Sequence, residues 1–176
     1  MAGPLLIDCG RSSEYVGVFF AFPVVAATAI GALAGGGLAD WLGHARAVAC
    51  LTAVIALDVS ALAAAYAASL GVSTIVGLLT ALDLLYGAFA ASSYAMFMDL
   101  TDPSLGATQF SAFMGATNLC EVWATYAVGR LVVTLDYAGA FLILAVVSFV
   151  SIPLVLGLRT LGAKQDVDAR HLTRPG

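Results

Sequence analysis

The chain has 176 residues, of which 61% are hydrophobic and only 10% are charged, and its formal net charge is −4. A soluble domain carries about a quarter charged residues, so this composition excludes an ordinary water-soluble fold and predicts an integral protein of the lipid bilayer. The few basic residues form no run that would neutralise a row of phosphates, which argues against nucleic acid as a partner.

The apolar stretches of the chain have the length of membrane spans. Residues 1–14 form an outer N-terminal segment without the basic start and apolar run of a secretory signal. The first apolar stretch, at about 15–35, ends in a glycine-rich turn that carries Asp40 and Arg46. Further stretches follow at about 47–68, 72–98, 108–133 and 138–158. Each is close to the roughly 20 residues that a transmembrane helix needs.

Helices are the expected form of all these stretches. They are twice as long as the strands of a membrane barrel, and backbone groups in lipid must find their partners within the segment. Gly, Ala, Ser and Thr recur in them, and such small residues let helices pack closely in a membrane. The sequence therefore predicts an all-α, polytopic bundle of about five transmembrane helices at 15–158, with a polar cytoplasmic tail at 159–176.

The placement of Lys and Arg predicts the orientation of this bundle. One side carries Arg46, Arg159, Lys164, Arg170 and Arg174, and the other side carries Arg11 and Arg130. The side that is richer in basic residues is normally cytoplasmic. With five helices, we expect a multi-pass protein of the cell (inner) membrane with its N-terminus outside and its C-terminus in the cytoplasm.

Three acidic residues, Asp58, Asp83 and Glu121, lie inside the apolar stretches. A charged side chain at the centre of a membrane helix costs about 2.5 to 3.5 kcal/mol, so each is expected to face protein or water. At the helical rise, Asp83 and Glu121 lie about 18 Å from their helix ends, near the bilayer midplane. Asp58 has no comparable polar stripe beside it, which favours structural pairing over transport.

A polar face makes Glu121 the leading candidate for a substrate or proton pathway. Asn118 and Thr125 are spaced three or four residues from Glu121 and hence lie on the same helical face. Asp83, with Tyr86 beside it, belongs to a similar but weaker set on the third stretch. A carboxyl group in such a cavity has its charged form disfavoured by desolvation, and can carry a proton.

These residues also have structural interpretations. Glu121 and Asp83 could serve as buried hydrogen-bond partners that fix helix packing, and Arg130 could snorkel to the interface instead of pairing with a substrate or an acid. The three cysteines are odd in number and His44 has no partner at metal-ligand spacing, so we expect no disulfide framework, metal site or cofactor. We expect no enzyme, since no nucleophile triad or phosphate loop is present.

Residues 36–46, GGLADWLGHAR, resemble the G-x-x-x-D-x-x-G-R-[RK]-x motif of the major facilitator superfamily of transporters. Gly36, Asp40, Gly43 and Arg46 match the motif, while intervening positions that are usually basic or polar depart from it, as is typical of its degenerate second copy. The resemblance implies a cytoplasmic gate, in which Asp40 accepts hydrogen bonds at a helix amino terminus. The alternative is a simple hairpin turn.

Residues 99–130 are similar to the region of helices ten and eleven in AmpG-like permeases, the peptide and acetyl-CoA transporter group. Thr108, Gln109 and Phe110 match its A-T-Q-[FY] opening, and residues 4–17 resemble the outer link between helices seven and eight. On this resemblance the five stretches correspond to helices eight to twelve of a partial major facilitator fold.

The resemblance implies the C-terminal portion of a secondary active, proton-coupled permease or symporter of small organic solutes, such as peptides or sugar-peptides. Such transporters hold a central site between two halves that rock against each other. The chain is therefore expected to be a fragment that needs the missing N-terminal half or another partner chain. The alternative is a non-transporting membrane scaffold or assembly partner, whose buried acids only specify packing.

Overall fold

The protein is helical throughout the part that the structure describes, which is the backbone of residues 2–102 and 104–172 in a computed structural model. Helix accounts for 91% of the chain, with no strand in the described ranges. Among the described residues, four segments are long and apolar enough to cross a membrane: Ser13–Leu42, His44–Ala67, Val72–Asp99 and Gly106–Leu154. The predicted all-helical, multi-pass membrane bundle is thus confirmed at this level.

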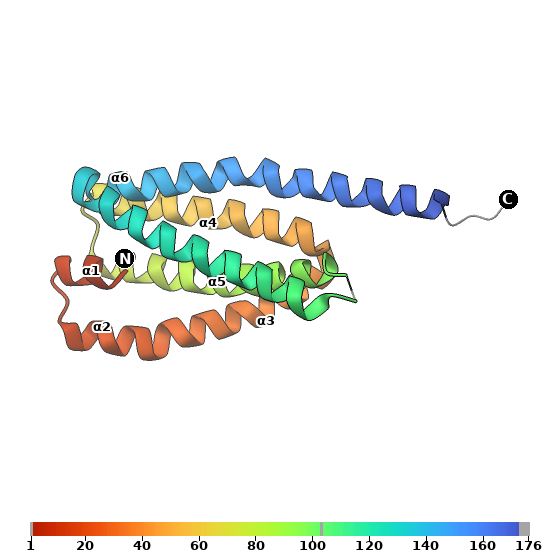
Figure 1. The fold of residues 1–176 in the computed structure, drawn as a ribbon. Helices are drawn as coiled ribbons and strands as arrows, with labels where there is room; N and C mark the ends of the chain where they lie inside the picture. Colours follow the sequence, from red (N-terminus) through yellow and green to blue (C-terminus); the bar gives the residue numbers. More distant parts are fainter. Residues whose placement is uncertain (1, 103, 173–176) are drawn as a thin grey trace.

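The helices follow one another with short connections (Figure 1). In chain order they are α1 (Ala2–Asp8), α2 (Ser13–Phe19), the π-helix η1 (Phe20–Val24), α3 (Val25–Leu42), α4 (His44–Ala67), α5 (Val72–Asp99) and α6 (Gly106–Leu172). The segments α2, η1 and α3 form one continuous span. The π-helix contains Pro23, which has no backbone N–H to donate and would disturb regular α-helical bonding.

The last helix, α6, is broken at Asp136. This residue has φ 64° and ψ 174°, which lies outside helical geometry, and the break separates a first arm at 106–135 from a second arm at 137–172. Figure 1 shows the two arms running in opposite directions. The second arm continues as helix to Leu172, through most of the predicted tail 159–176, whose last four residues and basic side chains lie outside the described part.

The first span does not end at about residue 35, as the sequence predicts, but continues as α3 to Leu42. The chain turns only at Gly43, whose φ of 82° favours glycine. The physical reason is close packing of α3 on α5. A Cβ atom added at Gly31 or Gly35 would collide with the backbone carbonyl of Leu84 or Ala88 of α5.

The contact between α3 and α5 is made from both sides by glycine. A Cβ atom at Gly87 of α5 would in turn collide with the carbonyl of Thr28 of α3. Beside this crossing the buried Ser92 hydroxyl donates a hydrogen bond to the Gly35 carbonyl, with an Oγ to O distance of 3.0 Å. Small residues therefore pack helices in this bundle as they do in other membrane proteins.

The hydrophobic core gathers at the end of the bundle that holds the N-terminus, between α1, α2, α4, α5 and the second arm of α6. Its members are Leu5, Leu6, Phe19, Val59, Leu62, Ala63, Ile75, Leu79, Tyr137, Phe141 and Ala145. Leu5 and Leu6 of α1 are fully buried, so the predicted outer segment is part of the core. The first arm of α6 differs, because no residue between Ala107 and Ala127 is buried.

Candidate functional site

The polar face predicted on the fourth apolar stretch exists on the first arm of α6. Asn118, Glu121 and Thr125 line one open hollow of about 620 Å³, together with Val122 and Tyr126. All five side chains are exposed. The three- and four-residue spacing of the polar residues in the sequence is what brings them to one face of the helix.

A side chain from α5 reaches this face. The Tyr86 hydroxyl donates a hydrogen bond to Oε1 of Glu121, which joins α5 to α6 across 35 positions of sequence. Glu121 and Tyr86 also line a second cleft of about 510 Å³ between α5 and the first arm of α6. The sequence nominates both residues, but only the fold shows that they touch.

The other two acids in the spans lie away from these hollows. Asp58 and Asp83 are each half-buried, and neither lines the hollows that contain Glu121. Asp58 lies nine residues before the end of α4, and Asp83 lies eleven residues after the start of α5. Measured from the turn that joins these two helix ends, the two acids lie at similar depths of about 14 and 17 Å. The predicted pairing of Asp58 is not found, since its buried Oδ2 has no hydrogen-bond partner among the described residues.

Arg130 lies apart from Glu121 on the same helix. It is exposed on the first arm of α6, nine residues after Glu121, or about 14 Å along the helix. The structure shows no ion pair for Arg130 within the described ranges. The polar face of α6 thus has a carboxylate without a nearby guanidinium.

The residues of the gate motif lie around the turn between α3 and α4. Gly36 and Asp40 belong to α3, and Gly43 forms the turn, where its carbonyl accepts hydrogen bonds from the N–H groups of Arg46 (3.1 Å) and Ala47 (3.0 Å). Asp40 is exposed in the last turn of α3, and among the described residues no backbone N–H of a helix amino terminus donates to its carboxylate, so its capping role stays a prediction. Only a carboxylate near an N-terminus gains from the helix dipole.

At this end of the bundle a different acid, Asp99, contacts the start of α4. Nδ1 of His44, the first residue of α4, forms a hydrogen bond with Oδ2 of Asp99 at the end of α5, and this contact is an ion pair when the imidazole is protonated. The two side chains border a hollow of about 260 Å³ that Arg46 also lines. Sequence reasoning missed this pair, since the two residues are 55 positions apart and share only their placement at helix ends.

The connection between α5 and α6 is held by local hydrogen bonds. The Asp102 carboxylate accepts from the Ser104 backbone N–H (2.8 Å) and from its hydroxyl (2.6 Å). These bonds stabilise the charged form, so the pKa of Asp102 lies below its usual 3.8. The Gln109 side chain accepts from the Asp102 N–H at 2.8 Å, which gives this residue of the A-T-Q-[FY] pattern a structural role.

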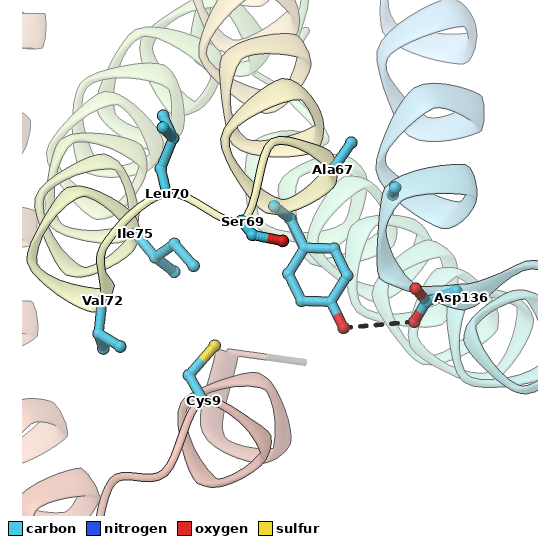
Figure 2. A pocket seen from close by; sticks show the side chains of 9 residues that line it. Cys9, Ala67, Ser69, Leu70, Val72, Ile75 and Asp136 are labelled. Atoms are coloured by element: carbon cyan, nitrogen blue, oxygen red, sulfur yellow. Dashed lines mark hydrogen bonds between the residues drawn. The ribbon is translucent and has the colours of Figure 1, made fainter.

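At the opposite end, a pocket of about 470 Å³ lies where α1, the α4–α5 turn and the break in α6 meet (Figure 2). The Tyr66 hydroxyl donates to Oδ1 of Asp136 at 3.4 Å, and the Tyr137 hydroxyl donates to Oδ2 of Asp8 at 2.8 Å. Cys9 faces the pocket from the N-terminal segment. No group of three His, Cys, Asp or Glu residues in the described ranges is arranged to hold a metal ion.

Comparison with known proteins adds no assignment. No protein-family model, no curated protein and no solved structure matches the chain.

Proposed function

We propose that the chain is the C-terminal portion of a proton-coupled secondary active transporter of small organic solutes. In this proposal the two arms of α6 are the last two of five membrane spans in a partial major facilitator fold, with the N-terminus outside and the C-terminus in the cytoplasm. The observation that carries the proposal is the open hollow on a membrane-length helix that contains Asn118, Glu121 and Thr125.

The exposure of Glu121 supports a water-lined or partner-covered face. An ionisable side chain that faced hydrocarbon at this depth would cost several kcal/mol, so such residues face a bundle interior or a wet cavity. In the described part of the chain α5 touches the first arm of α6 without burying it, because none of the residues from Ala107 to Ala127 is buried. A second half of the transporter would cover it and complete a central site.

The hydrogen bond from Tyr86 supports a role for Glu121 in coupling to protons. An ionised carboxylate accepts a charge-assisted hydrogen bond, which is roughly twice as strong as a neutral one. Protonation of Glu121 would therefore weaken the bond that joins α5 to α6. A proton and a solute that both act at this carboxylate would bias the same helix contact.

The gate end supports a role in alternating access. Gly43 makes the α3–α4 turn and the His44–Asp99 pair joins that turn to the end of α5. In this proposal Gly36, Asp40 and Arg46 lie at the cytoplasmic face, where a short turn between two spans must shift when the bundle rocks. The His44–Asp99 contact is the interaction in this region that would hold one conformation.

The test is solute-driven proton movement in proteoliposomes that contain the chain together with its complementing N-terminal half. A pH-sensitive dye inside the vesicles reports proton entry when dipeptides or amino sugars are added. We expect proton entry with the native chain, its loss in Glu121→Gln, and its retention in Asp58→Asn, which removes an acid outside the hollow. Proton entry that persisted unchanged in Glu121→Gln would reject the coupling role.

The scaffold alternative is favoured by the same Tyr86–Glu121 bond, because a hydrogen bond between two helices can serve packing alone. In that case Glu121→Gln and Tyr86→Phe would lower the stability of the bundle to a similar extent, and no solute would drive proton movement with any added half. Uptake measured beside denaturation in detergent separates the two functions.

A further inference from the structure

The cleft between α5 and the first arm of α6 has two matched walls. The lining residues of α5 include Tyr86, Ala90, Ser93 and Phe97, and those of α6 include Phe113, Thr117, Cys120 and Ala124. Both sets are spaced by four, three and four residues, which places each on one face of its helix. The two faces oppose each other around a volume of about 510 Å³.

The cleft is bounded by two contacts between the helices. The Phe97 and Phe113 rings stack with centroids 5.2 Å apart and planes inclined by 26°. The Tyr86–Glu121 hydrogen bond lies eleven residues away along α5, or about 17 Å. Small side chains such as Ala90 lie between them, so the helices touch at two places and leave a hollow of the size that small-molecule sites have.

A buried hydroxyl in this cleft lacks a partner. Ser93 lines the cleft and is only 6% exposed, and its Oγ has no hydrogen-bond partner in the part of the chain that the structure describes. Neighbouring hydroxyls do not share this state, since Thr117 donates to the Phe113 carbonyl at 2.9 Å. Buried polar groups in proteins are almost always hydrogen-bonded, so an unmet hydroxyl points to a bound group that completes it.

The charge of the cleft indicates the kind of group. Glu121 uses Oε1 for Tyr86, which leaves Oε2 for another donor. No Lys, Arg or His lines the cleft, whereas the aromatic rings of Tyr86, Phe89, Tyr94, Phe97 and Phe113 do. A carboxylate attracts a cation, and aromatic faces attract cations and apolar groups alike.

We propose that this cleft binds an organic ammonium ion with an apolar or aromatic body. The ammonium group donates to Oε2 of Glu121 and, after a rotation of the Ser93 side chain that turns its buried Oγ toward the cleft, to the Ser93 hydroxyl oxygen, and the body lies along the aromatic rings. The role of this ion as a transported solute rests on the proposed function, but the binding site itself rests on the cleft.

The cysteines of the native chain provide the assay. Cys120 lines the cleft and is exposed, whereas Cys9 lines the distant pocket near α1. The purified chain in phosphatidylcholine nanodiscs is treated with N-ethylmaleimide, and mass spectrometry follows the alkylation of each cysteine. We expect 2-phenylethylammonium to slow alkylation at Cys120 and not at Cys9. The neutral analogue propylbenzene and the anion 3-phenylpropanoate should give no such protection.

Variants of the lining assign the protection to the proposed groups. Glu121→Gln should weaken protection by about tenfold or more, the value of a charge-assisted hydrogen bond, and Ser93→Ala by about two- to tenfold. Ala90→Leu fills the hollow without touching either polar group and should abolish protection. Asp58→Asn removes an acid outside the cleft and should leave it unchanged. Circular dichroism checks that each variant retains its helices.

Three results would overturn the site. Equal protection by propylbenzene would show an apolar groove without charge selectivity, and unchanged protection in Glu121→Gln would remove the carboxylate from the site. Failure of Cys120 to be alkylated would show a cleft closed to water and hence to an ammonium ion. Selective protection without solute-driven proton entry would keep the binding site and refute only its role in transport. Proton entry driven by neutral dipeptides, without protection of Cys120 by the ammonium ion, would refute the ammonium site and leave the proposed transport function standing.

Discussion

Replacing Gly87 by alanine should loosen the bundle where α3 crosses α5. The added Cβ would lie 2.9 Å from the carbonyl carbon of Thr28, and still closer to its oxygen. Carbon atoms in good contact are about 3.5 to 4.0 Å apart, so the carbon alone requires the helices to separate by roughly 0.6 to 1.1 Å, and the closer oxygen requires more. The carbon and oxygen that the added Cβ meets belong to the helix backbone of Thr28, which cannot move aside as a side chain can. Overpacking of this kind costs about 1 to 3 kcal/mol.

The matched control for this substitution is Gly77→Ala on the same helix, where an added Cβ meets nothing within 4 Å. Alanine is the better helix former by up to about 1 kcal/mol in water, so the control should be neutral or stabilising. The assay is unfolding of the purified chain in mixed micelles with increasing sodium dodecyl sulfate, followed by circular dichroism. Equal midpoints for Gly87→Ala and Gly77→Ala would refute the close crossing of α3 and α5.

Three further outcomes follow from other contacts. The His44–Asp99 pair is partly solvent-exposed, so the coupling energy between the two side chains should be measurable but no more than about 1 kcal/mol. A double-mutant cycle of His44→Ala and Asp99→Asn, followed by unfolding in micelles, measures this energy. Strictly additive effects of the two substitutions would show that the side chains do not interact. Asp136→Gly should raise the unfolding midpoint, because backbone angles of φ 64° and ψ 174° are nearly restricted to glycine and cost other residues about 1 to 3 kcal/mol. A lowered midpoint would show that the contacts of the Asp136 side chain stabilise the fold by more than this backbone strain costs. Asp102 should titrate by NMR below 3.8 in the native chain and closer to 3.8 in Ser104→Ala. Its contacts therefore stabilise the loop above the ordinary carboxyl pKa and are lost as the pH falls through the lowered one, and an unaltered titration in Ser104→Ala would contradict this.

The second and third membrane helices are the elements that the sequence predicts best. The expected ranges 47–68 and 72–98 compare with α4 at His44–Ala67 and α5 at Val72–Asp99. Their bounds are visible in the sequence because polar turn residues interrupt long apolar runs, and lipid requires a helix wherever such a run crosses it. No knowledge of neighbouring segments is needed for that inference.

The first helix shows where this reasoning fails. Glycine predicts a turn at residues 35–37 when only local preference is considered. In the bundle α3 stays helical there, because Gly31 and Gly35 allow α5 to approach its backbone. Whether a glycine breaks a helix or packs it depends on what lies across from it, and that neighbour comes from a segment some 50 positions further along the chain.

By itself the sequence determined that this is a helical membrane protein and that Asn118, Glu121 and Thr125 share one face, because hydropathy and helical period are local properties. The tertiary structure alone decided that Tyr86 meets Glu121, that His44 meets Asp99, and that Ser93 is buried in a hollow without a partner. These contacts depend on the register and spacing of helices that are distant in the sequence. The sizes of the side chains across the whole interface set that register, so it cannot be predicted from the sequence of any single segment.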